Sequence, residues 1–84
     1  MTDLAALGYI RSLPVEEPEQ WYRDGIVGRI FVIGHTQRGN WEAGIWTLMG
    51  ILPAGQYFAT AELAAAWGEE ADQRLANDRA ALLA

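Results

Sequence analysis

One extended run, residues 26–35, constrains the fold of this chain more than any other segment. Its apolar side chains occupy both alternations of a strand, with Ile26, Ile30 and Val32 on one side and Val27, Phe31 and Ile33 on the other. A strand with one face in water carries polar residues at every second position, so this run predicts a central strand. We therefore expect a sheet covered on both faces, or covered on one face and in contact with a partner through the other.

Further extended segments are expected on the C-terminal side of this run. Residues 37–40 have the composition of a turn, and residues 41–51 then return as a second strand. Residues 53–56 supply the next turn, after which residues 57–58 would begin a short third strand.

A long helix is expected over residues 60–82, with Thr60 as its N-cap. Helical spacing predicts an apolar stripe made of Leu63, Ala64, Trp67, Ala71, Leu75 and Leu82. The opposite side would carry Glu62, Glu69, Asp72, Gln73 and Ala76. Asp78 projects onto the apolar stripe, so either the helix outruns the core there or its last turn meets something polar.

Two alternatives stay open for the N-terminal residues. Leu4, Leu7 and Ile10 follow helical spacing behind a cap at Thr2 or Asp3, although Gly8 would cost such a helix about 1 kcal/mol relative to alanine. Residues 9–15 read equally well as an alternating strand, and Pro14 ends whichever element forms. The acidic residues 16–19 then connect to one helical turn, because Pro18 suits a first helical position and Gly25 the site after the last.

These elements together predict one α+β domain over residues 1–84. We expect a three- to four-stranded antiparallel sheet packed against one long C-terminal helix, with an N-terminal helical or edge segment. The order helix–strand–strand–strand–helix is similar to that of double-stranded-RNA-binding domains. The formal net charge of -5 argues against that function, because nucleic-acid binding depends on Lys and Arg neutralising phosphates.

The inventory of reactive side chains favours binding over catalysis. The chain has one histidine and no cysteine, against four tryptophans and eleven carboxylates. His35 alone cannot supply a nucleophile, a base and an orienting group, so we expect no enzyme activity and no catalytic residue. With one imidazole and no thiolate, we also expect no metal site and no cofactor. The absence of a membrane-length apolar run and of a leader pattern predicts a cytoplasmic protein that does not bind membranes.

Trp46 is the best single anchor for a partner. Trp41 and Trp46 have opposite parity on one strand, so one can join the core beneath the helix while the other lies on the second face. Trp46 would be flanked by Glu42 and by Arg29 or Arg38. Coverage of the second face by residues 4–22 is the plain alternative and is slightly favoured. The sharper alternative is a recognition surface, since tryptophan dominates binding hot spots.

The junction between the third strand and the helix carries a resemblance to a known family. Residues 58–67 combine an aromatic residue, a Thr-x-Glu cap and a tryptophan on the same helix. This pattern resembles the strand-to-helix junction of some small bacteriophage anti-CRISPR proteins, which place a helix against a short antiparallel sheet. The resemblance implies a compact inhibitor that blocks a CRISPR surveillance complex by occupying a protein or nucleic-acid surface. It transfers no functional residue.

The leading functional prediction is therefore a phage- or mobile-element-encoded protein that inhibits a host defence complex. Its partner would be a protein with a basic surface, such as a Cas subunit, rather than nucleic acid itself. The predicted contact residues are four acids on the outer helix face and two aromatic anchors, namely Glu62, Glu69, Glu70, Asp72, Trp46 and Tyr57. The alternatives are that the acidic face is only solvated, and that the chain is a small homo-oligomeric scaffold or accessory domain, for example a homodimer, whose second sheet face is a self-interface.

Overall fold

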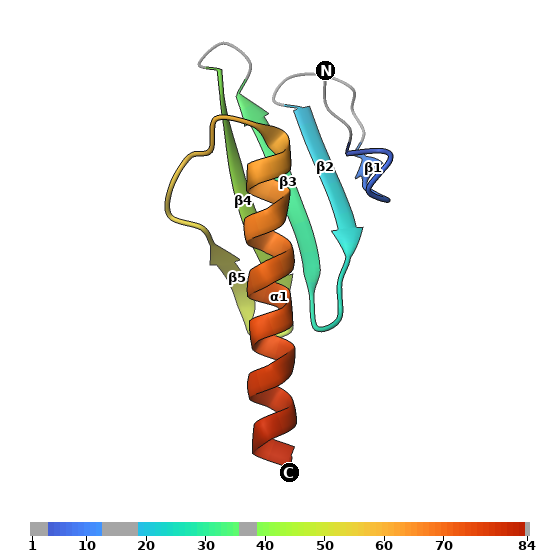
Figure 1. The fold of residues 1–84 in the computed structure, drawn as a ribbon, viewed down its shortest axis with the longest axis vertical. Helices are drawn as coiled ribbons and strands as arrows, with labels where there is room; N and C mark the ends of the chain where they lie inside the picture. Colours follow the sequence, from blue (N-terminus) through green and yellow to red (C-terminus); the bar gives the residue numbers. More distant parts are fainter. Residues whose placement is uncertain (1–3, 13–18, 36–38, 84) are drawn as a thin grey trace.

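The computed structural model describes residues 4–12, 19–35 and 39–83, which form five strands followed by one helix. The elements are β1 (Ile10–Arg11), β2 (Glu19–Asp24), β3 (Arg29–His35), β4 (Asn40–Thr47), β5 (Gly50–Pro53) and α1 (Ala61–Leu83). All neighbouring strands are antiparallel, and their order in the sheet is the order in the sequence (Figure 1). The α+β class is confirmed, with five strands where the sequence predicted three or four.

The N-terminal segment contributes an edge strand. Residues 4–8 form turns, and β1 pairs with β2 through Ile10 opposite Tyr22. Of the two alternatives for this segment, the edge strand is therefore correct. The expected caps at Thr2 or Asp3 and the expected stop at Pro14 lie outside the described residues.

The helical turn predicted between Pro18 and Gly25 is wrong, because Trp21 and Tyr22, which lie within that segment, belong to β2. Six residues of β2 pair with β3, and aromatic side chains pack well on such a pleated surface. This pairing outweighs the turn signal of Gly25; Pro18 lies outside the described residues. The chain order is therefore five strands and then a helix, which differs from the order expected for double-stranded-RNA-binding domains.

The segment predicted as one strand over residues 41–51 is a hairpin. Leu48 and Met49 form its turn, and Gly50 has a φ of 119°, which favours glycine. The Thr47 hydroxyl stabilises this turn by accepting a hydrogen bond from the Met49 backbone N–H at 3.1 Å. Turn composition did not predict it because the two turn residues are apolar. The expected third strand is reduced to a bridge between Phe58 and Trp41.

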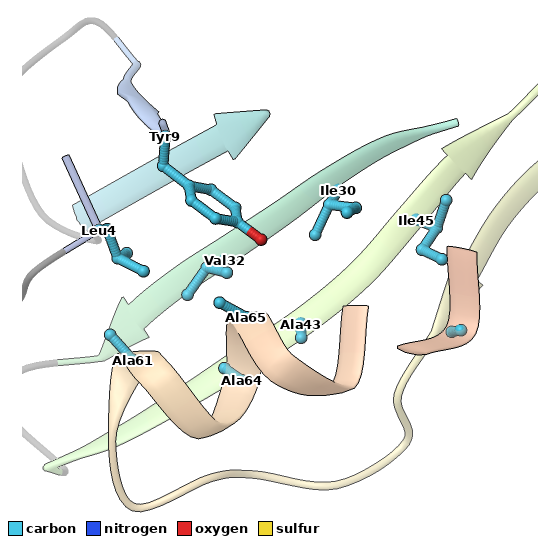
Figure 2. Packing of buried hydrophobic residues seen from close by; sticks show 10 residues of the cluster. Leu4, Tyr9, Ile30, Val32, Ala43, Ile45, Ala61, Ala64 and Ala65 are labelled. Carbon is cyan, nitrogen blue, oxygen red and sulfur yellow. The ribbon is translucent and has the colours of Figure 1, made fainter. Parts of the chain in front are cut away.

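Helix α1 begins as predicted, with the Thr60 hydroxyl accepting a hydrogen bond from the Leu63 backbone N–H at 3.2 Å. It packs on one face of the sheet, against β3 and β4 (Figure 1). Figure 2 shows Leu4 and Tyr9 on this same side of the sheet, next to the first turns of the helix. The buried cluster is rich in small residues and consists of Leu4, Tyr9, Ile30, Val32, Ala43, Ile45, Ala61, Ala64, Ala65 and Ala71.

Small residues, rather than large ones, decide which side of α1 faces the sheet. Gly68 lies so close to Ile30 that an added Cβ would overlap the Ile30 side chain. The predicted apolar stripe is partly wrong, since Leu63 is 54% and Leu82 is 88% exposed, whereas its alanines, Ala64 and Ala71, are buried as expected. Trp67 and Leu75 are half-buried against the core, as expected. Asp78 is exposed because the last turns of α1 extend past the sheet (Figure 1).

Candidate functional site

The face of the sheet opposite α1 carries large side chains that no element of the described chain covers. They come from all five strands and are Ile10, Tyr22, Arg29, Phe31, Ile33, Trp46 and Ile51. We call this surface the open face. The cross-strand register places Tyr22 opposite Phe31, Arg29 opposite Trp46, and Trp46 opposite Ile51, so the aromatic side chains are neighbours.

A hollow of about 340 Å³ lies in the open face. It is lined by Ser12, Gln20, Trp21, Tyr22, Arg29, Phe31, Trp46 and Ile51. The ring of Phe31 lies across Gly44, where an added Cβ would overlap it. The Phe31 ring thus rests on the backbone of β4 and forms part of the lining of the hollow.

Trp46 lies at the rim of this hollow and is 60% exposed. Trp41 lies on the other face and packs against the core, with its ring over Gly34, so the predicted opposite parity is confirmed. Arg29 is the predicted neighbour of Trp46, whereas Arg38 lies outside the described residues. The favoured coverage of Trp46 by the N-terminal segment is wrong for the described residues, because Leu4 and Tyr9 turn toward α1 (Figure 2).

The charges on the open face are paired within the chain. Arg29 donates a hydrogen bond to Asp24 at 2.7 Å, and its guanidinium lies 4.7 Å from the centre of the Tyr22 ring. The hydrogen bond from Arg29 lowers the pKa of the Asp24 carboxyl below its ordinary value. His35 and Glu42 form a second pair at 2.6 Å between Nε2 and Oε2. The face therefore carries few charged groups, and both of its carboxylates have a partner in the same chain, although the net charge of the whole chain is -5.

His35 has one carboxylate partner and one aromatic neighbour. The ring of Tyr57 approaches its ring edge-on, with the centroids 6.0 Å apart. Since His35 has open-face parity, this contact places Tyr57, which is 53% exposed, at the border of the open face. Both predicted aromatic anchors thus belong to one surface. In the part of the chain that the structure describes, no cluster of three His, Cys, Asp or Glu side chains is positioned to hold a metal.

The four acidic residues predicted on the outer helix face do not share one surface. Asp72 is 4% exposed, and its carboxylate accepts hydrogen bonds from the backbone N–H groups of Ile26 at 2.7 Å and Val27 at 2.9 Å. The prediction that Asp72 faces outward is therefore wrong. The small residues that bring α1 close to the sheet also turn position 72 toward the β2–β3 turn.

Glu69 is also directed toward the sheet rather than away from it. It pairs with Arg23 at 2.8 Å and accepts a weak hydrogen bond from the Tyr9 hydroxyl at 3.5 Å. Glu62 is half-buried. Glu70 is exposed and forms the predicted pair with Arg74, at 3.3 Å. Of the four acids, only Glu70 is in the exposed position that the sequence predicted.

Comparison with known proteins adds no relative. No protein-family model, no curated protein and no solved structure matches this chain. Among the described residues, no helix is long and apolar enough to cross a membrane. The open face is therefore the candidate site on its geometry alone.

Proposed function

We propose that this chain is a non-catalytic protein-interaction module whose contact surface is the open face, with Trp46 as the central anchor. The observation that carries the proposal is the position of Trp46, 60% exposed at the rim of a preformed hollow. Large apolar side chains gathered on one exposed face mark interaction surfaces. Tryptophan, tyrosine and arginine, all present here, dominate the energetics of such surfaces.

The narrower proposal is inhibition of a host defence complex. The net charge of -5 and the junction at residues 58–67 support it, and they favour a basic partner. In this proposal the partner would be contacted by Trp46 on the open face and by Tyr57 at its border. The electrostatic part is weaker than the sequence suggested, because Glu69 and Asp72 are engaged within the chain.

The contact surface can be tested by site-specific photo-cross-linking in cells that express the chain. A photoreactive residue at position 51, on the open face, should yield cross-linked protein adducts. The same residue at position 63 is the matched control, because Leu63 is similarly exposed but lies on α1, which packs on the opposite side of the sheet. Adducts from position 63 with none from position 51 would contradict the proposal.

The inhibitor proposal has its own test. In cells with an active CRISPR–Cas system, expression of the chain should restore plaque formation by a targeted phage. Trp46→Ala should abolish the effect, whereas Asp78→Ala on the exposed helix end should leave it intact. Normal targeting in the presence of the wild-type chain would rule out inhibition of that system without contradicting the open face as a contact surface.

A further inference from the structure

We infer that the occupant of the open face is a second copy of this chain, with the two sheets packed face to face and both α1 helices outermost. This inference rests on the proposed function, since it names the partner of the same surface. In such a dimer, the β3 side chains that face away from α1 would be buried between the two sheets, and those that face α1 would stay in the core beneath the helix. Three properties of the open face support it.

The first property is charge. Both carboxylates identified on the face have a partner in the same chain, Asp24 the Arg29 guanidinium and Glu42 the His35 ring. A strongly basic partner would have little to gain here, because these carboxylates are already engaged. Two copies of a chain with net charge -5 repel each other overall, and the open face, which carries few charged groups, is where they can approach at the lowest electrostatic cost.

The second property is shape. A two-fold symmetric interface uses the same patch on both copies, so a protrusion and its matching recess must lie on one surface. The open face has both, because Trp46 stands at the rim of the hollow lined by Tyr22, Phe31 and Ile51. A two-fold axis near the middle of the sheet would place each Trp46 ring in the hollow of the other copy.

The third property is area. The five strands are two to eight residues long. At about 4.8 Å between strands and about 3.3 Å per residue, they make a face of roughly 430 Å² in projection. Two such faces bury roughly 860 Å², which is in the range of weak or transient interfaces. Stacked sheets lie about 10 Å apart, which suits interdigitating aromatic and aliphatic side chains. We therefore expect a dimer with a dissociation constant in the micromolar range.

Sedimentation equilibrium from about 1 μM to about 1 mM protein tests this inference. The mass should rise from 9.3 kDa toward twice that value. Trp46→Ala and Ile51→Arg should each weaken the dimer at least about tenfold, as expected for central contact residues. Leu63→Ala, on the helix, should leave the dissociation constant unchanged. Because Trp46 and Ile51 are both exposed, the Trp46→Ala and Ile51→Arg variants should keep the wild-type circular dichroism spectrum.

The salt dependence of binding distinguishes a second copy of this chain from a basic partner. Raising NaCl from about 0.05 M to about 0.5 M screens the repulsion between two acidic copies, so the dimer should become tighter, whereas binding to a basic partner would become weaker. A chain that stays monomeric at about 1 mM in high salt overturns the self-pairing but leaves the open face available to another protein. A dimer that resists both open-face variants yet is lost on substituting Leu48 and Met49 overturns self-pairing through this face, again without contradicting the proposed function.

Discussion

Asp72 links the helix to the sheet through two backbone donors that would otherwise lack partners in the turn between β2 and β3. Its carboxylate is buried, and hydrogen bonds to a charged acceptor are stronger than neutral ones. The residue therefore fixes the position of α1 along the sheet. A residue that the sequence suggested as part of a binding surface thus holds the fold together.

Asp72→Ala should lower the free energy of unfolding by about 3 kcal/mol, because two backbone N–H groups would lose a charged acceptor. Asp72→Asn should have a smaller effect, since one amide oxygen remains. Asp78→Ala is the matched control on the same helix and should change the value by less than about 0.5 kcal/mol, because Asp78 is exposed. Urea unfolding followed by circular dichroism measures all three. Equal effects of the two alanine variants would show that the Asp72 contacts do not stabilise the fold.

The buried Tyr9 side chain should make the folded protein less stable at high pH. Burial, together with the nearby Glu69 carboxylate, raises the pKa of Tyr9 from 10.0 to about 12. Between these two values the unfolded chain loses the phenolic proton while the folded chain keeps it, so the free energy of unfolding falls as pH rises. The loss should amount to roughly 2 kcal/mol between about pH 10 and pH 12.

Tyr9→Phe tests this dependence because phenylalanine has no proton to release. The variant should be less sensitive to pH above about 10 than the wild type in urea unfolding series. The other two tyrosines remain in both proteins, so their titration cancels in the comparison. Parallel pH profiles for the two proteins would show that Tyr9 ionises as freely in the folded chain as in the unfolded one.

At the scale of elements, the sequence predicts those whose signal is local. The helix was expected over residues 60–82 and is found at Ala61–Leu83. The central strand was expected over residues 26–35 and is found at Arg29–His35, because Ile26 and Val27 belong to the turn that precedes it. The capping oxygen of Thr60 and the double apolar alternation of β3 are patterns that need no tertiary context. The two elements that the sequence did not predict depend on such context. The strand β2 forms because it pairs with β3, and the β4–β5 turn was missed because its sequence is apolar.

Gly44 is the strand residue on which the shape of the open face depends. Gly44→Ala should push the Phe31 ring away from the backbone, because the added Cβ would overlap it. We expect a loss of about 1–3 kcal/mol in unfolding free energy, as for other overpacked sites, and a weaker dimer. Gly44→Ala combined with Phe31→Ala should cost less than the sum of the single changes, since the overlap is then gone. Strict additivity in this double-mutant cycle would show that the two residues do not interact.

For the whole molecule, the sequence predicted which face carries Trp46 but not that this face is open. The parity of Trp46 placed it on the face opposite the helix, with Arg29 or Arg38 beside the ring, and Arg29 is its cross-strand partner. Coverage of that face by residues 4–22 was slightly favoured and is wrong for the described residues. The hollow was not predicted, because it arises from the register that sets Phe31 over Gly44. The acidic helix surface was misplaced, because the rotation of α1 is set by Ala61, Ala64 and Gly68 rather than by its leucines.

A dimer formed through the open face predicts that thermal stability depends on protein concentration. Folding coupled to association shifts the unfolding midpoint upward as concentration rises. Over a hundredfold range we expect an increase of about 5 °C for the wild-type chain. Trp46→Ala should unfold at one temperature throughout the range, and calorimetry at several concentrations gives the comparison. A wild-type midpoint that does not move would agree with a monomer.

The order of the elements along the chain also has a consequence for biosynthesis. Each strand pairs with the strand before it, so the sheet can assemble progressively as the polypeptide leaves the ribosome. The helix follows all five strands, which means that Ile30, Val32 and Ile45 are the last to lose contact with water. During that interval the nascent sheet exposes apolar side chains on both sides, a state that invites aggregation and engagement by chaperones. Once α1 has left the exit tunnel it can cover these residues, and the new chain is then less prone to aggregate.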